Sequence, residues 1–118
     1  MVSIDNFKQV ELPKKGTCKF ILVELYDSKK TKIVLIGDPK KTYHNEIYKH
    51  YLSKIPTCFK VIILGGGKIS INDSTIHAYG KSYTYGIAPQ ELVEKILNMY
   101  VEENRLNQKV RVDMGHNC

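Results

Sequence analysis

Apolar residues along the chain gather in short runs whose spacing predicts the secondary structure. The run at 18–26 (CKFILVELY) is apolar on both alternating faces, which is typical of a strand covered on both sides, and 31–37 (TKIVLIG) is its expected antiparallel neighbour. A buried strand is predicted at 58–67, where it runs into three glycines, and 68–86 is predicted to form two or three short strands around a turn. Alternating apolar and charged residues at 109–114 (KVRVDM) indicate an outer strand with one face in solvent.

Two segments change to the period of an amphipathic helix. The first helix is predicted to begin at Asp38 or at Thr42 and to end before Pro56, and its apolar stripe consists of Ile47, Tyr48, Tyr51, Leu52 and Ile55. The second is predicted within 88–106, where Pro89 suits the first turn. Two helices allow few crossover connections, so most strand pairs should be antiparallel.

These elements predict one fold class. We expect an α/β protein of the α+β type, in which a mixed, mostly antiparallel sheet of about six strands packs with two helices. The chain of 118 residues is of single-domain length, and we treat 1–118 as one domain.

Charge and cysteine content narrow the class of partner and the compartment. The formal net charge of +6 favours anionic partners, namely phosphate groups, nucleic acid or acidic proteins, without choosing among them. No apolar run reaches membrane-spanning length, and the N-terminal stretch lacks the features of a secretory signal. Because three widely separated cysteines fit reduced thiols better than disulfides, we expect a cytoplasmic protein without a membrane partner.

A Gly-Lys-Ser triplet at 80–82 invites comparison with nucleotide-binding loops. Such a loop needs another glycine five residues before the triplet, and that position is Thr75. Gly67-Lys68 fails the same test, because Ile62 and Ile69 stand at the required positions. The three glycines at 65–67 are therefore more simply interpreted as a bulge or tight turn where backbone passes close to backbone.

Two charged or titratable residues lie on faces that are otherwise apolar. His44 precedes Ile47, Tyr48 and Tyr51 with helical spacing, so it lies on the buried stripe near the start of its helix. That position favours a neutral imidazole and attracts anions, although a core or capping histidine is the simpler interpretation. Lys19 lies in phase with the aliphatic face of 18–26, and its ammonium either reaches outward to solvent or faces a pocket as a phosphate counter-charge.

Three tyrosines, at 79, 83 and 85, alternate along the predicted strand that includes 82–86. A row of this kind is typical of packing, and it is also suited to stacking nucleic-acid bases. The positive charge is dispersed lysine and no recognised RNA-binding motif is present, so we expect no nucleic-acid partner.

Three short motifs stand in order along the chain, namely YHNEIY (43–48), LGGGKIS (64–70) and IHAYGKSYTYG (76–86), together with Lys19 at the start of a strand. This set resembles the phosphohistidine phosphatase family, which includes the janus and ocnus proteins. The order and spacing of the motifs are similar to those of the family between about residues 19 and 100. The N-terminal arm, residues 27–40 and the C-terminal tail lie outside this resemblance.

The resemblance implies an activity and a site. Family members remove phosphate from phosphohistidine in proteins, in some cases also from phospholysine, and use no metal or other cofactor. It implies His44 as the catalytic residue, either as a general base or as a phosphoryl acceptor, and phosphohistidine-containing proteins as partners of a monomeric enzyme. The substrate-binding residues implied in the same way are Lys19, Tyr43, Asn45, Ser82, Tyr83 and Thr84.

The sequence also departs from the family. An arginine that helps to hold phosphate aligns with Ile36 here, and Lys40 or Lys41 is the nearest possible substitute. A lysine offers a point charge rather than the two-pronged hydrogen bonding of arginine. A non-catalytic phosphoprotein-binding module is therefore the first alternative function, and a small basic nucleic-acid-binding protein is the second.

Overall fold

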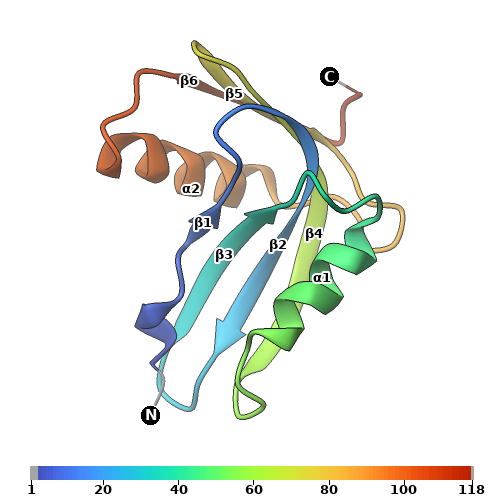
Figure 1. Cartoon of the computed structure of the whole chain (residues 1–118), viewed down its shortest axis with the longest axis vertical. Helices are drawn as coiled ribbons and strands as arrows, with labels where there is room; N and C mark the ends of the chain where they lie inside the picture. The colour runs from blue at the N-terminus through green and yellow to red at the C-terminus, as the bar shows by residue number, and fades with distance from the viewer. Residues whose placement is uncertain (1–2, 118) are drawn as a thin grey trace.

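Six strands form one mixed sheet in the order β1-β3-β2-β4-β5-β6 (Figure 1). The protein is represented by a computed structural model that describes residues 3–117. The strands are β1 Val10–Glu11, β2 Gly16–Tyr26, β3 Thr31–Gly37, β4 Lys60–Ile71, β5 Thr75–Gly80 and β6 Lys109–Met114. The helices are α1 His44–Ser53 and α2 Gln90–Glu103, with a 3-10 turn, η1, at Ile4–Asn6. The predicted fold class, α+β with a mixed six-stranded sheet and two helices, is confirmed.

Antiparallel pairs make up the centre of the sheet. In the part of the chain that the structure describes, β2 pairs with β3 and β4, and β4 pairs with β5, all antiparallel. The outer strands β1 and β6 pair in parallel with β3 and β5. The predicted excess of antiparallel pairing is therefore confirmed, and β6 is the outer strand that its alternating sequence predicted.

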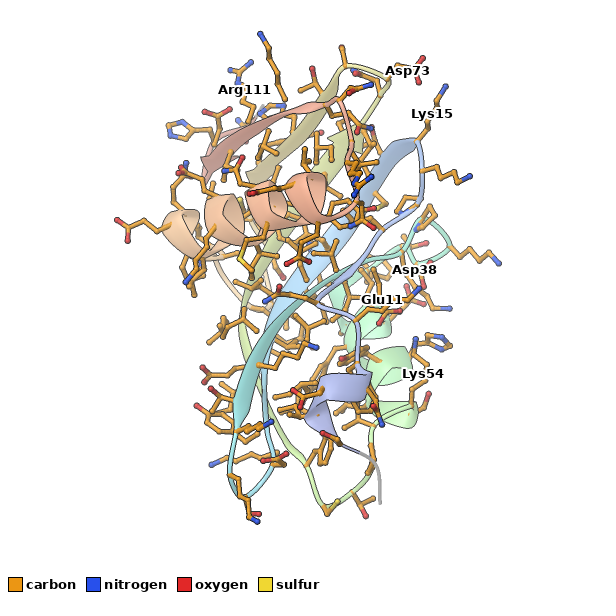
Figure 2. All side chains as sticks on the ribbon, turned by 90° about the vertical axis from the view of Figure 1, so that its left-hand side faces the viewer. Glu11, Lys15, Asp38, Lys54, Asp73 and Arg111 are labelled. Atoms are coloured by element: carbon orange, nitrogen blue, oxygen red, sulfur yellow. The ribbon has the colours of Figure 1, made fainter. Side chains whose placement is uncertain are left out.

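The two helices lie on opposite faces of the sheet, as Figure 2 shows. Successive side chains of a strand point to opposite faces, so β2 contributes to both layers. Phe20 and Leu22 belong to a core shared with α2, whereas Ile21 and Val23 belong to a core shared with α1. This double burial confirms the prediction that 18–26 is covered on both sides. None of the helices within residues 3–117 is long and apolar enough to span a membrane.

Helix α1 covers only part of its face of the sheet. Beyond it the side chains in phase with Ile21 are polar, and most of them are half-buried or exposed. The strand register places them in two rows across β2, β4, β5 and β6. We call this surface the open face; it consists of Thr17, Lys19, Lys68, Ser70, His77, Tyr79, Arg111 and Asp113.

The start of α1 and the course of β4 differ from the sequence prediction. Helix α1 begins at His44, later than either Asp38 or Thr42. The Asp38 carboxylate instead accepts the Lys40 N–H (2.9 Å) in a preceding turn, while the Glu46 carboxylate accepts the N–H groups of residues 42 and 43 (3.2 and 2.9 Å). Strand β4 continues through the three glycines rather than ending at them.

The glycines of β4 nevertheless permit the close backbone contacts that were predicted. A register shift in the β2–β4 pairing occurs next to Gly65, whose φ is +144°. A Cβ there would lie 2.5 Å from the Ala88 nitrogen, so only glycine lets the segment before α2 pack on the strand.

The segment 82–86 is a turn, and the prediction of a strand there is wrong. Strand β5 ends at Gly80, and Ser82 and Gly86 close the turn by donating N–H to each other's carbonyl oxygen (3.0 and 2.8 Å). Consequently Tyr79, Tyr83 and Tyr85 do not share a strand face. The ring of Tyr85 packs edge-on against Tyr48, whereas Tyr83 is 97% exposed.

Candidate functional site

His44 lies at the first turn of α1 with its ring against β4. Its side chain is buried, as its place on the apolar stripe predicted. The Nε2–H donates a hydrogen bond to the Gly67 carbonyl oxygen (2.9 Å). Because a carbonyl oxygen can only accept, this contact places the proton of the neutral ring on Nε2 and leaves the lone pair on Nδ1.

The surroundings of His44 favour the neutral imidazole. Burial lowers the pKa of His44 below its usual value of 6.5, the hydrogen bond to Gly67 partly opposes this, and the positive charges of Lys19 and Lys68 lower it further. At neutral pH the ring is therefore uncharged, which is the state that a general base or a nucleophile requires.

Lys19 lies beside the start of the same helix. Its Nζ donates to the Thr42 carbonyl oxygen (2.6 Å) and lies 5.4 Å from the centre of the Tyr43 ring. The ammonium is thus held near the start of α1. The sequence alone had left open whether it reaches solvent or faces a pocket. Since it lies close enough to affect the His44 pKa, the structure brings these two predicted residues together.

Lys68 is a second cation at the site that the sequence analysis did not identify as a site residue. It is the direct cross-strand neighbour of Lys19 on the open face, and its charge also acts on His44. The sequence pattern that could have placed Lys68 on the same face as Lys19 is its alternation with Gly66 and Ser70 along one strand. This pattern was not recognised because the strand was predicted to stop at the glycines.

Gly66 forms the floor between His44 and Ser82. A Cβ at Gly66 would lie 2.9 Å from the Cδ2 of His44, 3.2 Å from the Cβ of Ser82 and 2.8 Å from the Phe20 carbonyl oxygen. The missing side chain therefore lets the imidazole and the buried Ser82 approach the same point of the sheet. Because Ser82 and His44 both lie against Gly66, Ser82 is the third predicted residue that belongs to the site.

Backbone donors are available around this floor. The Ser82 N–H is already bonded to Gly86, and its Oγ accepts the Tyr85 N–H (3.1 Å). Within residues 3–117, however, the N–H groups of Tyr83 and Thr84 have no protein acceptor. The predicted phosphate-binding backbone thus has two free donors rather than three. The first turn of α1 adds the free N–H groups of His44 and Asn45.

Four predicted side chains are exposed, namely those of Tyr43, Asn45, Tyr83 and Thr84. Tyr43 contacts the site through its ring, beneath Lys19. The side chains of Asn45 and Thr84 form no hydrogen bond in the described part of the chain, so the structure does not bring them into the site.

The position of the family arginine is part of the core. Ile36 is 6% exposed and packs in the cluster beneath α1. Lys40 is exposed, Lys41 is half-buried, and neither forms an ion pair in the described residues. Replacement of the arginine by Lys40 or Lys41 stays a prediction, and the cations whose charges act on His44 are Lys19 and Lys68.

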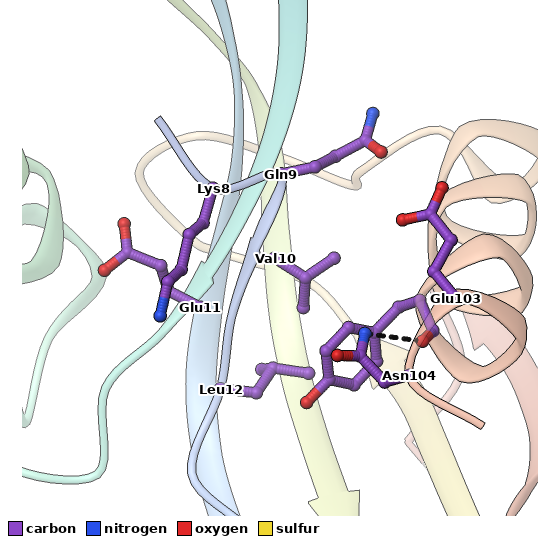
Figure 3. Close-up of a pocket in the computed structure, with 8 residues that line it drawn as sticks. Lys8, Gln9, Val10, Glu11, Leu12, Glu103 and Asn104 are labelled. Atoms are coloured by element: carbon purple, nitrogen blue, oxygen red, sulfur yellow. Dashed lines mark hydrogen bonds between the residues drawn. The ribbon is translucent and has the colours of Figure 1, made fainter. Parts of the chain in front are cut away.

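A hollow in the surface lies away from the predicted site residues. Its volume is about 550 Å³, and Figure 3 shows it between the segment 8–12 and the end of α2. Its lining includes apolar Val10 and Leu12 as well as charged Lys8 and Glu103. None of the predicted site residues lines it. Size alone therefore does not locate the candidate site.

The fold and site define a class: an α+β domain with a basic site, built around a neutral histidine at the start of a helix. The family model of the Janus/Ocnus family matches residues 4–104, and the chain belongs to this family. The match extends beyond the resemblance seen in the motifs, since it includes most of the N-terminal arm and residues 27–40. A comparison with curated proteins found no match.

Proposed function

We propose that the protein is a phosphohistidine phosphatase that hydrolyses the P–N bond of phosphohistidine in partner proteins. The main support is the neutral His44 ring beside two cations, on a glycine floor with free N–H donors, in a chain of the Janus/Ocnus family. Anionic phosphoryl oxygens suit Lys19, Lys68 and the N–H groups of Tyr83 and Thr84. Positioning and charge stabilisation are the main protein contributions in phosphoryl transfer.

In the first route, His44 acts as a general base. Its Nδ1 takes a proton from water, the water oxygen forms a bond to phosphorus, and the P–N bond breaks. The electron pair of that bond passes to the substrate imidazole nitrogen, which takes up the proton that His44 received from water, so His44 is neutral again. The products are inorganic phosphate and an unmodified histidine.

In the second route, His44 accepts the phosphoryl group. Its Nδ1 lone pair forms the new bond to phosphorus as the substrate P–N bond breaks. The electron pair of the broken bond passes to the substrate imidazole, which takes a proton from solvent. Water then hydrolyses the phosphorylated His44 to phosphate and the free imidazole. A trapped phosphoryl group on His44 after rapid acid-free quenching would select this route over the first.

The test is release of phosphate from a phosphohistidine peptide by wild-type protein, His44→Ala and His50→Ala. His50 is exposed on the same helix, so it controls for loss of an imidazole from α1. We expect loss of turnover in His44→Ala alone. Addition of a chelator is expected to leave the wild-type rate unchanged, and wild-type turnover in His44→Ala would refute both routes.

A non-catalytic phosphoprotein-binding module is the second candidate. The observation that favours it is the buried Ile36 at the position of the family arginine. Tight binding of a phosphohistidine peptide by the wild-type protein without phosphate release would select this function. The nucleic-acid alternative loses its proposed stacking surface, because the three tyrosines do not form a row.

A further inference from the structure

A small basic hollow adjoins the site on the open face. Its volume is about 190 Å³, and it is lined by Lys68, Tyr79, Gly80, Lys81, Tyr83, Gly115 and Asn117. It shares Lys68 and Tyr83 with the site around His44. The proposed function makes no use of the rest of this hollow, which we call the side pocket.

The backbone leaves room for the side pocket. Strand β5 ends at Gly80, whose φ of +77° lies in the left-handed region that favours glycine. The carbonyl oxygen of Gly80 accepts the Gly115 N–H (2.8 Å), which joins the end of β5 to the segment after β6. Part of the pocket lining is therefore held by a backbone contact between two residues that have no side chain.

Among the described residues that line it, the side pocket presents cations and aromatic rings and no acidic side chain. The Lys81 Nζ lies 5.6 Å from the centre of the Tyr83 ring. Neither Lys68 nor Lys81 forms an ion pair in residues 3–117. The nearest carboxylate in the strand register is Asp113, beside Tyr79, and it is already bonded to His77 and Arg111 (both 2.8 Å). The pocket is therefore complementary to a negatively charged group.

The size of the pocket limits what that group is. Sites for drug-sized ligands occupy about 300–1,000 Å³, so about 190 Å³ fits one amino-acid side chain rather than a nucleotide. Consecutive Cα atoms lie about 3.8 Å apart, so a residue next to a phosphohistidine bound at His44 stays close to Lys68 and Tyr83.

We propose that the side pocket is a specificity subsite that takes the side chain of an aspartate or glutamate next to the phosphohistidine of the substrate. This inference rests on the proposed function for its location. Lys81 contributes the charge that is specific to this subsite, whereas Lys68 serves both the phosphoryl group and the neighbouring carboxylate.

The test measures binding of peptides that carry a stable carbon-linked analogue of phosphohistidine, flanked on either side by glutamate or by alanine. The proteins are wild type, Lys81→Gln and Lys95→Gln; Lys95 is exposed on α2 and matches the charge change. We expect wild type to bind a glutamate-flanked peptide about two- to fivefold more tightly, the range typical of partly exposed ion pairs. That preference should persist in Lys95→Gln and disappear in Lys81→Gln.

Two results would overturn the subsite: equal binding of both peptides by wild type, or the same loss of preference in both variants. Hydrolysis of the labile phosphohistidine peptides is measured in parallel. Because binding of the stable analogue needs no turnover, absent hydrolysis with an intact Lys81-dependent preference would refute the phosphatase proposal and leave the subsite supported.

Discussion

Tyr51 carries a buried hydroxyl that contributes nothing evident to the fold. Its Oη has no hydrogen-bond partner within residues 3–117, and burial raises the pKa of Tyr51. We predict that Tyr51→Phe leaves the free energy of unfolding unchanged or raises it by up to about 1 kcal/mol, because it removes an unsatisfied polar group. Tyr26→Phe, which loses a hydrogen bond to Glu24, is the contrasting variant in urea unfolding. A clear loss of stability in Tyr51→Phe would contradict this.

His44 gives the stability of the protein a defined pH dependence. Its pKa is lowered by folding, so below about pH 6.5 the unfolded chain takes up a proton that the folded protein does not. The stability that wild type has relative to His44→Gln should therefore be full above this pH and fall as the pH decreases through the folded pKa. Urea midpoints measured between about pH 7.5 and 5 test this, with His50→Gln as the control. A difference that stays constant or grows on acidification would contradict it.

At the residue scale, the sequence pointed to His44 as a candidate site residue but did not predict the contacts that place it. His44 was predicted on the buried stripe because its spacing to Ile47 and Tyr51 has the period of a helix. The hydrogen bond from its Nε2 to Gly67 was not predictable, because it joins an element start to a strand that is distant in the sequence. Lys68 was missed for a related reason: its role depends on the register with Lys19.

At the scale of elements, strand β4 depends on glycine where it forms the floor of the site. We predict that Gly66→Ala destabilises the protein by roughly 1–3 kcal/mol. The new Cβ would overlap the Phe20 carbonyl oxygen and the His44 ring, and the strand backbone cannot relax freely to relieve this. The substitution should also shift the NMR signals of the His44 ring. Gly16→Ala is the control for the His44 signals, because an alanine would be strained at the φ of +107° but its Cβ would meet no atom within 4 Å. An unperturbed His44 in Gly66→Ala would contradict the role of this floor.

The start of α2 protects the outer edge of the sheet. The Gln90 amide donates to the Val112 carbonyl oxygen (2.5 Å) and accepts the Met114 N–H (2.8 Å), as a neighbouring strand would. We predict that Gln90→Ala lowers the free energy of unfolding by about 1–2 kcal/mol and speeds hydrogen exchange at Met114. Asn98→Ala, which removes a side-chain bond on the exposed side of α2, should leave that exchange rate unchanged. Unaltered protection of Met114 in Gln90→Ala would refute this.

Helices and strands were predictable where the period of apolar residues determines them. They were less predictable where local polar contacts determine where an element begins or ends. The core strands and both helices follow their apolar patterns. The first helix begins at His44 because Glu46 satisfies the preceding N–H groups, while Asp38 is used in a turn of its own. The alternation of 82–86 imitates a strand, yet hydrogen bonds between Ser82 and Gly86 close it into a turn.

At the scale of the whole molecule, both cores share one strand. Alternate residues of β2 pack against α2 and against α1, so the loss of either layer exposes one apolar face of a strand on which the other layer also depends. We predict a single cooperative thermal transition, in which far-UV circular dichroism and tyrosine fluorescence coincide and the calorimetric and van't Hoff enthalpies agree. Two separated transitions would show that the layers unfold independently.

The open face also determines how large a substrate the proposed enzyme can accept. A deep pocket admits only a flexible loop or a chain end, because a folded partner cannot follow its modified residue inside. The residues around His44 instead lie at the border of α1 and the polar open face of the sheet. A histidine that projects from the surface of an intact globular domain can reach such a place without local unfolding of its own backbone. On this geometry, the conformation of the partner protein imposes little restriction, and selection between partners depends on the few residues that surround the modified histidine.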